Sequence, residues 1–263
     1  MTSPLHTIWT HVHPAVCSLV FKVGNNRISS GSGFKIGQRL LTNNHVVQVP
    51  GATHVTLRFV GADGSSDTAS RTLTIQELQA KLLDGDPADA WDFAIYDLSW
   101  PEFAKTPSLA LAPATSTSIG DPVALFGFQF DQSNLSVHAG VLASRFVQKG
   151  VKYLQIDASV NQGNSGGPLI DLSTCLVIGI VTRKATGLTQ EFDALLHSFD
   201  QNIQALKGSQ GAMRVGPIDP FEVLMVSQEQ MKRVSLEIRR SANVGIGYAY
   251  ELDKVRGSSA LNN

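Results

Sequence analysis

The run 161–169, Asn-Gln-Gly-Asn-Ser-Gly-Gly-Pro-Leu, is the most informative part of the chain, because a turn of small residues leads directly into an apolar segment. Three glycines surround Ser165, and glycine is used where the backbone takes a positive φ or passes close to another group. Such a turn can aim the N–H groups of Gly163 and Ser165 at one point and stabilise an oxyanion there. The run predicts a nucleophilic serine, with an ordinary glycine-rich hairpin as the alternative.

A serine hydroxyl is a weak nucleophile until a base takes its proton, so a matching histidine and carboxylate are expected. Of the seven histidines, His45 alone lies in the turn after an expected β-hairpin, and the others are assigned to surface or strand positions. Asp92 directly precedes an alternating, strand-like run and is the first candidate for the carboxylate. Asp84, Asp86 and Asp89 remain alternatives in a turn where aspartate is common for local reasons.

The order histidine, aspartate, serine along the chain is one of the known orders of this catalytic triad. The sequence resembles the chymotrypsin-fold serine proteases, and among them most closely the HtrA (Deg) group. The segments that carry the resemblance follow the family's order from about residue 16 to residue 255 and are GSGF, TNNHVV, DPADAWDFAIYDL, QIDASVNQGNSGGPL, VIGIVT and NVGIGYAYELDKV.

This resemblance implies an all-β fold of two antiparallel six-stranded β-barrels, with a helical insertion before the last strand. The N-terminal barrel, residues 1–105, would carry His45 and Asp92, and the C-terminal barrel, residues 106–263, would carry Ser165. The resemblance makes Ser165 the nucleophile, His45 the general base and Asp92 the carboxylate that orients the base. The implied reaction is hydrolysis of a protein or peptide through an acyl-enzyme, without a metal or an organic cofactor.

The resemblance also implies an oxyanion hole formed by the N–H groups of Gly163 and Ser165. It assigns substrate binding to Ser159, Val160, Val181, Thr182, Arg183, Lys184 and Ile246. Ser159 would lie at the base of the primary pocket, and because Ser159 is uncharged and its neighbours are apolar, we expect cleavage after residues such as Val, Ala or Leu. Glu191 or Asp193 could still reach in from the insertion and reverse this preference.

Two expectations concern activation and regulation. In digestive zymogens the new N-terminus pairs with an aspartate just before the nucleophile, whereas Asn164 stands there in this chain and cannot form an ion pair. Cleavage of an N-terminal propeptide is therefore not expected to be required. Because only a short tail follows Glu251, the PDZ domain that many members of the HtrA group carry is not expected either.

The insertion, at about residues 187–243, is predicted to form two helices. The apolar side chains on one face of the first are Phe192, Leu195, Leu196, Phe199, Ile203 and Leu206. The second begins at Asp219 as its N-cap, with a proline at the first helical position, and its apolar face consists of Leu224, Met231, Val234 and Ile238. We expect these faces to pack against each other and on the barrel.

Because the insertion is rooted beside the pocket strands, it is predicted to cap the cleft or shape the pocket, and a regulatory partner could act there. The alternative is a lateral decoration away from the cleft. Near residue 74, Thr74 and Glu77 are spaced as a capping box that opens a short helix, with another strand as the alternative.

Two further motifs support weaker interpretations. The residues around Ser165 also fit the G-x-S-x-G elbow of α/β-hydrolases, with Asp193 and His197 following. These two lie in a helical pattern, however, and short strands precede the serine. The segment 31–33, Gly-Ser-Gly, lacks the third glycine of a dinucleotide-binding loop and opens no helix.

Composition restricts the remaining possibilities. The chain has 263 residues, 43% of them hydrophobic, and a formal net charge of −1, so no surface for nucleic acid is indicated. No apolar run approaches the roughly 18 residues of a membrane span, and residues 1–13 lack the pattern of a secretory signal. Cys17 and Cys175 form neither a disulfide framework nor a metal-ligand spacing. We therefore expect a cytoplasmic protein. The alternative to the peptidase function is a catalytically silent binding module for a partner protein.

Overall fold

The computed structural model describes residues 3–113, 116–130, 132–184, 189–241 and 245–261. Two compact units are present, one formed by Met1–Ala185 together with Gly245–Asn263 and the other by Thr186–Val244. The first unit is mostly β-structure and the second consists of two long helices. None of the helices within the described residues is both long and apolar enough to cross a membrane.

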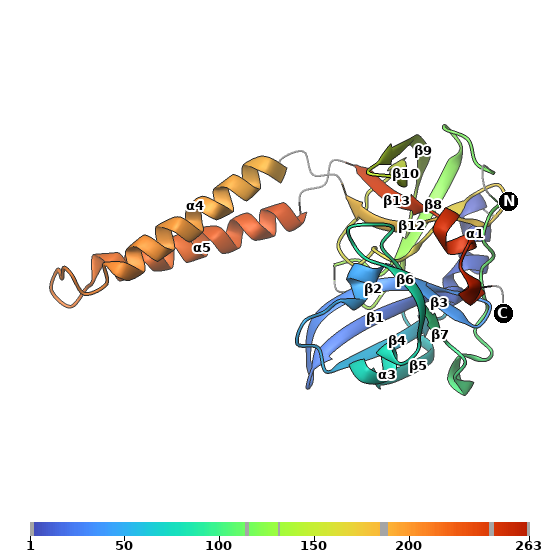
Figure 1. The fold of residues 1–263 in the computed structure, drawn as a ribbon, viewed down its shortest axis with the longest axis horizontal. Coiled ribbons are helices and arrows are strands. Elements are labelled where there is room, and N and C mark those ends of the chain that lie inside the picture. Colours follow the sequence, from blue (N-terminus) through green and yellow to red (C-terminus); the bar gives the residue numbers. More distant parts are fainter. Residues whose placement is uncertain (1–2, 114–115, 131, 185–188, 242–244, 262–263) are drawn as a thin grey trace. The chain divides into compact units, whose positions relative to one another are not determined.

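The N-terminal half of the first unit is an antiparallel sheet in the order β5-β4-β1-β2-β3-β7-β6 (Figure 1). Its strands are β1 Val16–Val23, β2 Asn26–Ile36, β3 Arg39–Thr42, β4 His54–Val60, β5 Asp67–Thr74, β6 Leu82–Asp86 and β7 Phe93–Asp97. The sheet has seven strands where six were expected. Both alternatives for the region near residue 74 apply, since the capping box of Thr74 and Glu77 opens α3, Ile75–Gln79, and β6 follows.

The C-terminal half is a closed barrel in the order β10-β13-β12-β11-β8-β9. Its strands are β8 Pro122–Gly127, β9 Ser136–Gln148, β10 Val151–Asp157, β11 Pro168–Asp171, β12 Val177–Lys184 and β13 Ile246–Glu251. Apolar side chains from these strands form a buried cluster inside the barrel. The closed six-stranded barrel and the all-β class are therefore as predicted.

A second buried cluster joins the two halves. It contains Phe34 and Leu41 from the N-terminal sheet together with Phe126 and Ile180 from the barrel. The N-terminal helix α1, Pro4–Val12, packs on the same cluster, with η1, His13–Ala15, after it. Because these side chains are buried together, the two halves hold each other in a defined position, which matters for a site with residues from both.

Short helices complete the first unit. They are α2 Asn44–Val47, η2 Pro101–Phe103, α6 Asp253–Arg256 and η3 Ser259–Leu261. Of these, α2 follows β3 directly and carries His45. The η2 turn is held through Lys35, whose amino group is buried and donates to the carbonyls of Phe103 and Thr106 over 2.8 and 2.7 Å.

The second unit is a helical hairpin of α4, Thr189–Gly208, and α5, Pro220–Ser241. The predicted insertion is thus helical, although the outermost residues of the range 187–243 lie outside the described part of the chain. The start of α5 is as predicted, because Asp219 accepts a hydrogen bond from the N–H of Phe221 over 2.9 Å. In α4 the predicted apolar face packs toward the partner helix, with Phe199 and Ile203 buried, whereas Leu195 is 41% exposed.

The prediction is wrong for the apolar face of α5. Leu224, Met231, Val234 and Ile238 are between 51% and 59% exposed. A different row of side chains at similar spacing is less exposed and includes Phe221, Met225, Gln228, Lys232 and Ser235. This row makes polar contacts with α4, because Gln228 accepts from Asn202 and Lys232 pairs with Asp200. The polar contacts and the small Ser235 set the rotation of α5, which sequence periodicity does not reveal.

Candidate active site

His45 and Asp92 form a tightly coupled pair. The distance between His45 Nδ1 and Asp92 Oδ2 is 2.6 Å, and the His45 backbone N–H donates to Asp92 Oδ1 over 2.9 Å. Both carboxylate oxygens therefore face the same residue. Asp92 is 2% exposed, while the His45 side chain is 40% exposed. When Nδ1 carries the proton toward the carboxylate, Nε2 is left as an acceptor on the accessible side, as a general base requires.

The backbone explains how Asp92 reaches this position. Its φ is +45°, in the left-handed region that aspartate tolerates better than most residues. Its carbonyl accepts from the Asn43 side chain over 2.8 Å, and β7 begins at the next residue. Two of the rival aspartates have other contacts, since Asp84 accepts from Ser258 and the Asp86 carbonyl accepts from Asn44.

Ser165 lies in a turn between β10 and β11 whose glycines are tightly enclosed. Gly163 and Gly166 have φ of +95° and +85°. A Cβ atom at Gly163 would lie 2.0 Å from the carbonyl oxygen of Phe128, and one at Gly166 would lie 2.1 Å from that of Ser32. Only glycine satisfies both the positive φ and this close approach, so the turn has the conformation that its composition predicts.

The turn that carries Ser165 is attached to the N-terminal sheet through Ser32 on β2. The Ser32 N–H donates to the carbonyl of Ser165 over 2.9 Å, and the Ser32 hydroxyl donates to the carbonyl of Gly163 over 2.7 Å. The same hydroxyl accepts from the N–H of Phe128 over 2.9 Å. Ser32 lies in the GSGF segment, but the sequence gives no indication of this role, because a contact between residues 131 positions apart leaves no local signal.

The Ser165 hydroxyl donates to the carbonyl oxygen of Thr182. Among the described residues, no hydrogen bond joins it to His45, and none leads from the N–H of Gly163 or Ser165 to a protein acceptor. Thr182 contacts both halves of the site, because its hydroxyl also donates to Asp92 Oδ2 over 3.5 Å.

Asn164, next to Ser165, is fully buried. Neither polar atom of its amide has a hydrogen-bond partner within the described part of the chain. An unsatisfied buried polar group costs about 1–3 kcal/mol, so the turn carries strain beside Ser165.

The residues assigned to substrate binding lie on β12, on β13 or just after β10, and they differ in exposure. Val160 and Val181 are 1% and 0% exposed and belong to the barrel core, whereas Ser159 and Ile246 are partly exposed. The backbones of Arg183 and Lys184 pair with Tyr248 and Gly247 across β12 and β13; their side chains lie outside the described part of the chain. Val160 fills the space beside Gly247, where a Cβ would lie 2.2 Å from Val160 Cγ2.

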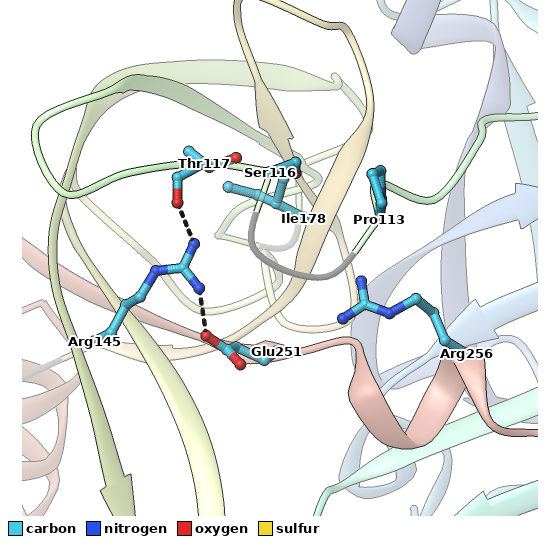
Figure 2. A pocket seen from close by; sticks show the side chains of 7 residues that line it. All are labelled: Pro113, Ser116, Thr117, Arg145, Ile178, Glu251 and Arg256. Atoms are coloured by element: carbon cyan, nitrogen blue, oxygen red, sulfur yellow. Dashed lines mark hydrogen bonds and ion pairs between the residues drawn. The ribbon is translucent and has the colours of Figure 1, made fainter.

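A separate polar cluster lines a small pocket of the C-terminal barrel (Figure 2). Arg145 donates to Glu251 Oε1 over 2.7 Å and to the carbonyl of Thr117 over 2.5 Å. Arg256 donates to the carbonyl of Ala112 over 2.7 Å and to Asp253 over 2.6 Å. Both guanidinium groups are therefore engaged by protein acceptors, which favours a structural role over anion binding.

Comparisons with known proteins find similarity to trypsin-like and HtrA-type peptidases. The profile of the trypsin-like peptidase domain matches residues 31–180, more than half of the chain. A probable periplasmic serine endoprotease DegP-like of Brucella suis is 35% identical over 161 residues, which cover 59% of this chain and 28% of the relative. The serine protease HTRA1A of Danio rerio is 31% identical over 180 residues, covering 64% and 33%. The chain thus spans about a third of the length of these curated relatives.

A solved structure of the HtrA-type protease AlgW with a tripeptide superposes with a TM-score of 0.60 at 20% identity, covering 97% of this chain and 61% of that one. This likeness supports the chymotrypsin-like double-barrel fold.

The expectation of a cytoplasmic location is wrong. Relatives from Brucella suis, Hahella chejuensis and Ectopseudomonas mendocina are named as probable periplasmic endoproteases, which points to the periplasm instead. The inference from Cys17 and Cys175 failed because an oxidising compartment permits disulfides without requiring them. A domain of this size buries enough apolar surface to fold without such cross-links.

Proposed function

This chain belongs to the trypsin-like peptidase family, and from that premise we propose that it is a serine endopeptidase that cleaves proteins or peptides through an acyl-enzyme. The observation that carries the proposal is the buried Asp92 carboxylate that holds His45, together with Ser165 on a turn attached to the same sheet. Residues 1–105 would contribute His45 and Asp92, and residues 106–263 would contribute the nucleophile Ser165.

In this mechanism Ser165 attacks the scissile carbonyl while His45 takes its proton and later returns it to the leaving amine. Asp92 keeps the imidazole in the tautomer with Nε2 free and stabilises the imidazolium that forms. The N–H groups of Gly163 and Ser165 would hold the oxyanion, each donor contributing roughly 10²–10³ in rate. For attack, the Ser165 hydroxyl must turn from the carbonyl of Thr182 toward His45, a tightening that free enzymes often require.

Substrate selection is proposed to rest on Ser159, at the base of an uncharged pocket, and on the backbone of β12 beyond Thr182. The absence of a charge at Ser159 favours small apolar side chains before the cleaved bond. Peptide profiling with a proteome-derived library tests this: enrichment of Val, Ala or Leu is expected, and predominant cleavage after Arg or Lys would contradict it.

A fluorophosphonate probe tests the activity itself, because it reacts only with an activated serine. The folded wild-type chain should be labelled and Ser165→Ala should not. Circular dichroism of both proteins serves as the control for folding. If the folded wild type is not labelled, the catalytically silent binding module becomes the better interpretation.

The helical insertion is proposed to be a regulatory element. The exposed row of Leu224, Met231, Val234 and Ile238 on α5 supports this, because exposed apolar side chains that share one helix face can serve as an interaction surface. A regulatory partner that covers the stripe would change peptide turnover.

A further inference from the structure

Asn43 lies at a position where a side chain ordinarily caps a helix. It is the N-cap residue of α2, between the end of β3 and the short helix that carries His45. Asparagine is a preferred N-cap residue, because its Oδ1 can accept from a free N–H of the first helical turn. Among the described residues the Asn43 side chain makes no such bond. The amide instead contacts Asp92, which lies 49 positions further along the chain.

The Asn43 amide holds the backbone of Asp92. Asn43 Nδ2 donates to the Asp92 carbonyl over 2.8 Å, and the Asp92 N–H donates to the carbonyl of Pro87 over 3.1 Å. These bonds fix the backbone on both sides of the Asp92 Cα, where φ is +45°. A left-handed residue other than glycine is strained and persists only when its surroundings hold it. Without the Asn43 bond, Asp92 could relax toward a negative φ and turn its carboxylate away from His45.

The Asp92 carboxylate takes the capping role that Asn43 leaves open. Asp92 Oδ1 accepts from the His45 N–H in the first turn of α2 over 2.9 Å, while Oδ2 lies 2.6 Å from His45 Nδ1. A capping side chain at position 43 would compete for the free N–H groups of this turn. Because the Asn43 amide faces the Asp92 backbone, the His45 N–H stays with the carboxylate.

This arrangement lowers stability in a way that a purely structural residue would avoid. Asn43 is 0% exposed, and its Oδ1 has no hydrogen-bond partner within the described part of the chain. A buried acceptor without a partner is destabilising, whereas a cap of α2 would have satisfied it. The fold therefore favours the bond to Asp92 over the cap, and departures of this kind are expected at functional sites.

We propose that Asn43 is a positioning residue of the active site: its amide holds the Asp92 backbone and leaves the His45 N–H to the carboxylate, so that both carboxylate oxygens face His45. Asn43 acts through Asp92 and touches no reacting atom. This role rests on the proposed peptidase function, in which a displaced carboxylate no longer fixes the imidazole that takes the proton of Ser165.

Two substitutions separate positioning from stability. Asn43→Ala removes the amide and supplies no cap, whereas Asn43→Thr keeps nearly the same volume and supplies a preferred N-cap. Asn43→Thr should therefore withstand urea better than Asn43→Ala. The second-order rate of fluorophosphonate labelling of Ser165 should nevertheless fall about tenfold in both, because neither side chain places a donor at the Asp92 carbonyl. A labelling rate that follows the stability of the two variants would overturn the proposal.

Proton NMR provides a second measurement, which does not depend on activity. In the wild type, the hydrogen between His45 Nδ1 and Asp92 Oδ2 should resonate far downfield, because this bond is short and charge-assisted. The resonance should move upfield in both Asn43 variants, since the carboxylate is no longer held against the imidazole. A loss of stability alone would leave the resonance of the folded molecules in place.

Asn44→Ala is the matched control, because Asn44 is the adjacent asparagine and its Nδ2 donates to the Asp86 carbonyl over 3.0 Å, away from Asp92. This variant should label within about twofold of the wild type and keep the downfield resonance. An unmoved resonance in the Asn43 variants, or an equal change in Asn44→Ala, would overturn the positioning role. Failure of the folded wild type to label would instead overturn the peptidase function, while the NMR comparison would still test Asn43, so the two failures are distinguishable.

Discussion

Replacing Gly163 by alanine tests whether the nucleophile turn needs its close packing. Gly163 has φ of +95°, and the new Cβ would lie 2.0 Å from the carbonyl oxygen of Phe128. The left-handed conformation costs an alanine about 1–2 kcal/mol. Overpacking adds about 1–3 kcal/mol, because a carbonyl of the backbone cannot give way as a flexible side chain does. We expect the free energy of unfolding to fall by about 2–5 kcal/mol in total.

Gly120 provides a matched control, because its φ is +96° and a Cβ added there would meet no atom within 4 Å beyond its chain neighbours. Gly120→Ala should therefore show the conformational cost alone, about 1–2 kcal/mol. Urea unfolding measures both variants. Fluorophosphonate labelling should fall by about 10²–10³ in Gly163→Ala, whose N–H is displaced, and should be unchanged in Gly120→Ala. Equal destabilisation in both variants, or normal labelling of Gly163→Ala, would refute the reasoning.

Three other predictions follow from the described contacts. Burial raises the pKa of Asp171, but hydrogen bonds from donors including Thr117 and Ser173 outweigh burial and leave the pKa below its ordinary value. The ionised carboxylate therefore stabilises the fold at pH values above the pKa of the unfolded state. This stability is lost as the pH falls through the pKa of the folded state. Asp171→Asn should lower the free energy of unfolding at pH 7 by about 1–3 kcal/mol, and a difference from wild type that persists undiminished in acid would contradict this. Burial raises the pKa of the Cys17 thiol to about 12. Iodoacetamide at pH 8 should therefore leave Cys17 unmodified in the folded chain and modify it in urea. Rapid modification of Cys17 without urea would show that β1 opens in the folded protein. Replacing residues 188–243 by a short Gly/Ser linker should change peptide turnover or cleavage preference at least about tenfold if the insertion acts on the cleft. Cooperative unfolding of the shortened chain is the control for folding. Unchanged kinetics would show that the insertion is a lateral decoration.

The exposed apolar row of α5 differs from the expectation for a reason that the sequence does not contain. Its periodicity identifies a helix and an apolar row, but the side of a helix that meets its partner depends on which contacts the partner offers. Here Asp200 and Asn202 on α4 engage Lys232 and Gln228, and the more apolar row is left exposed.

Local chemistry is what the sequence by itself determined. The glycines around Ser165, the turn that presents His45 and the strand after Asp92 are all encoded within a few residues, because positive φ, caps and alternation are short-range properties. Only the tertiary structure decided the long-range partners: the attachment of the Ser165 turn to Ser32, the bond from Ser165 to Thr182, and the bond from Thr182 to Asp92. These contacts join residues that are far apart in the chain, and their formation depends on how the sheet and the barrel pack together, which no neighbouring residue specifies.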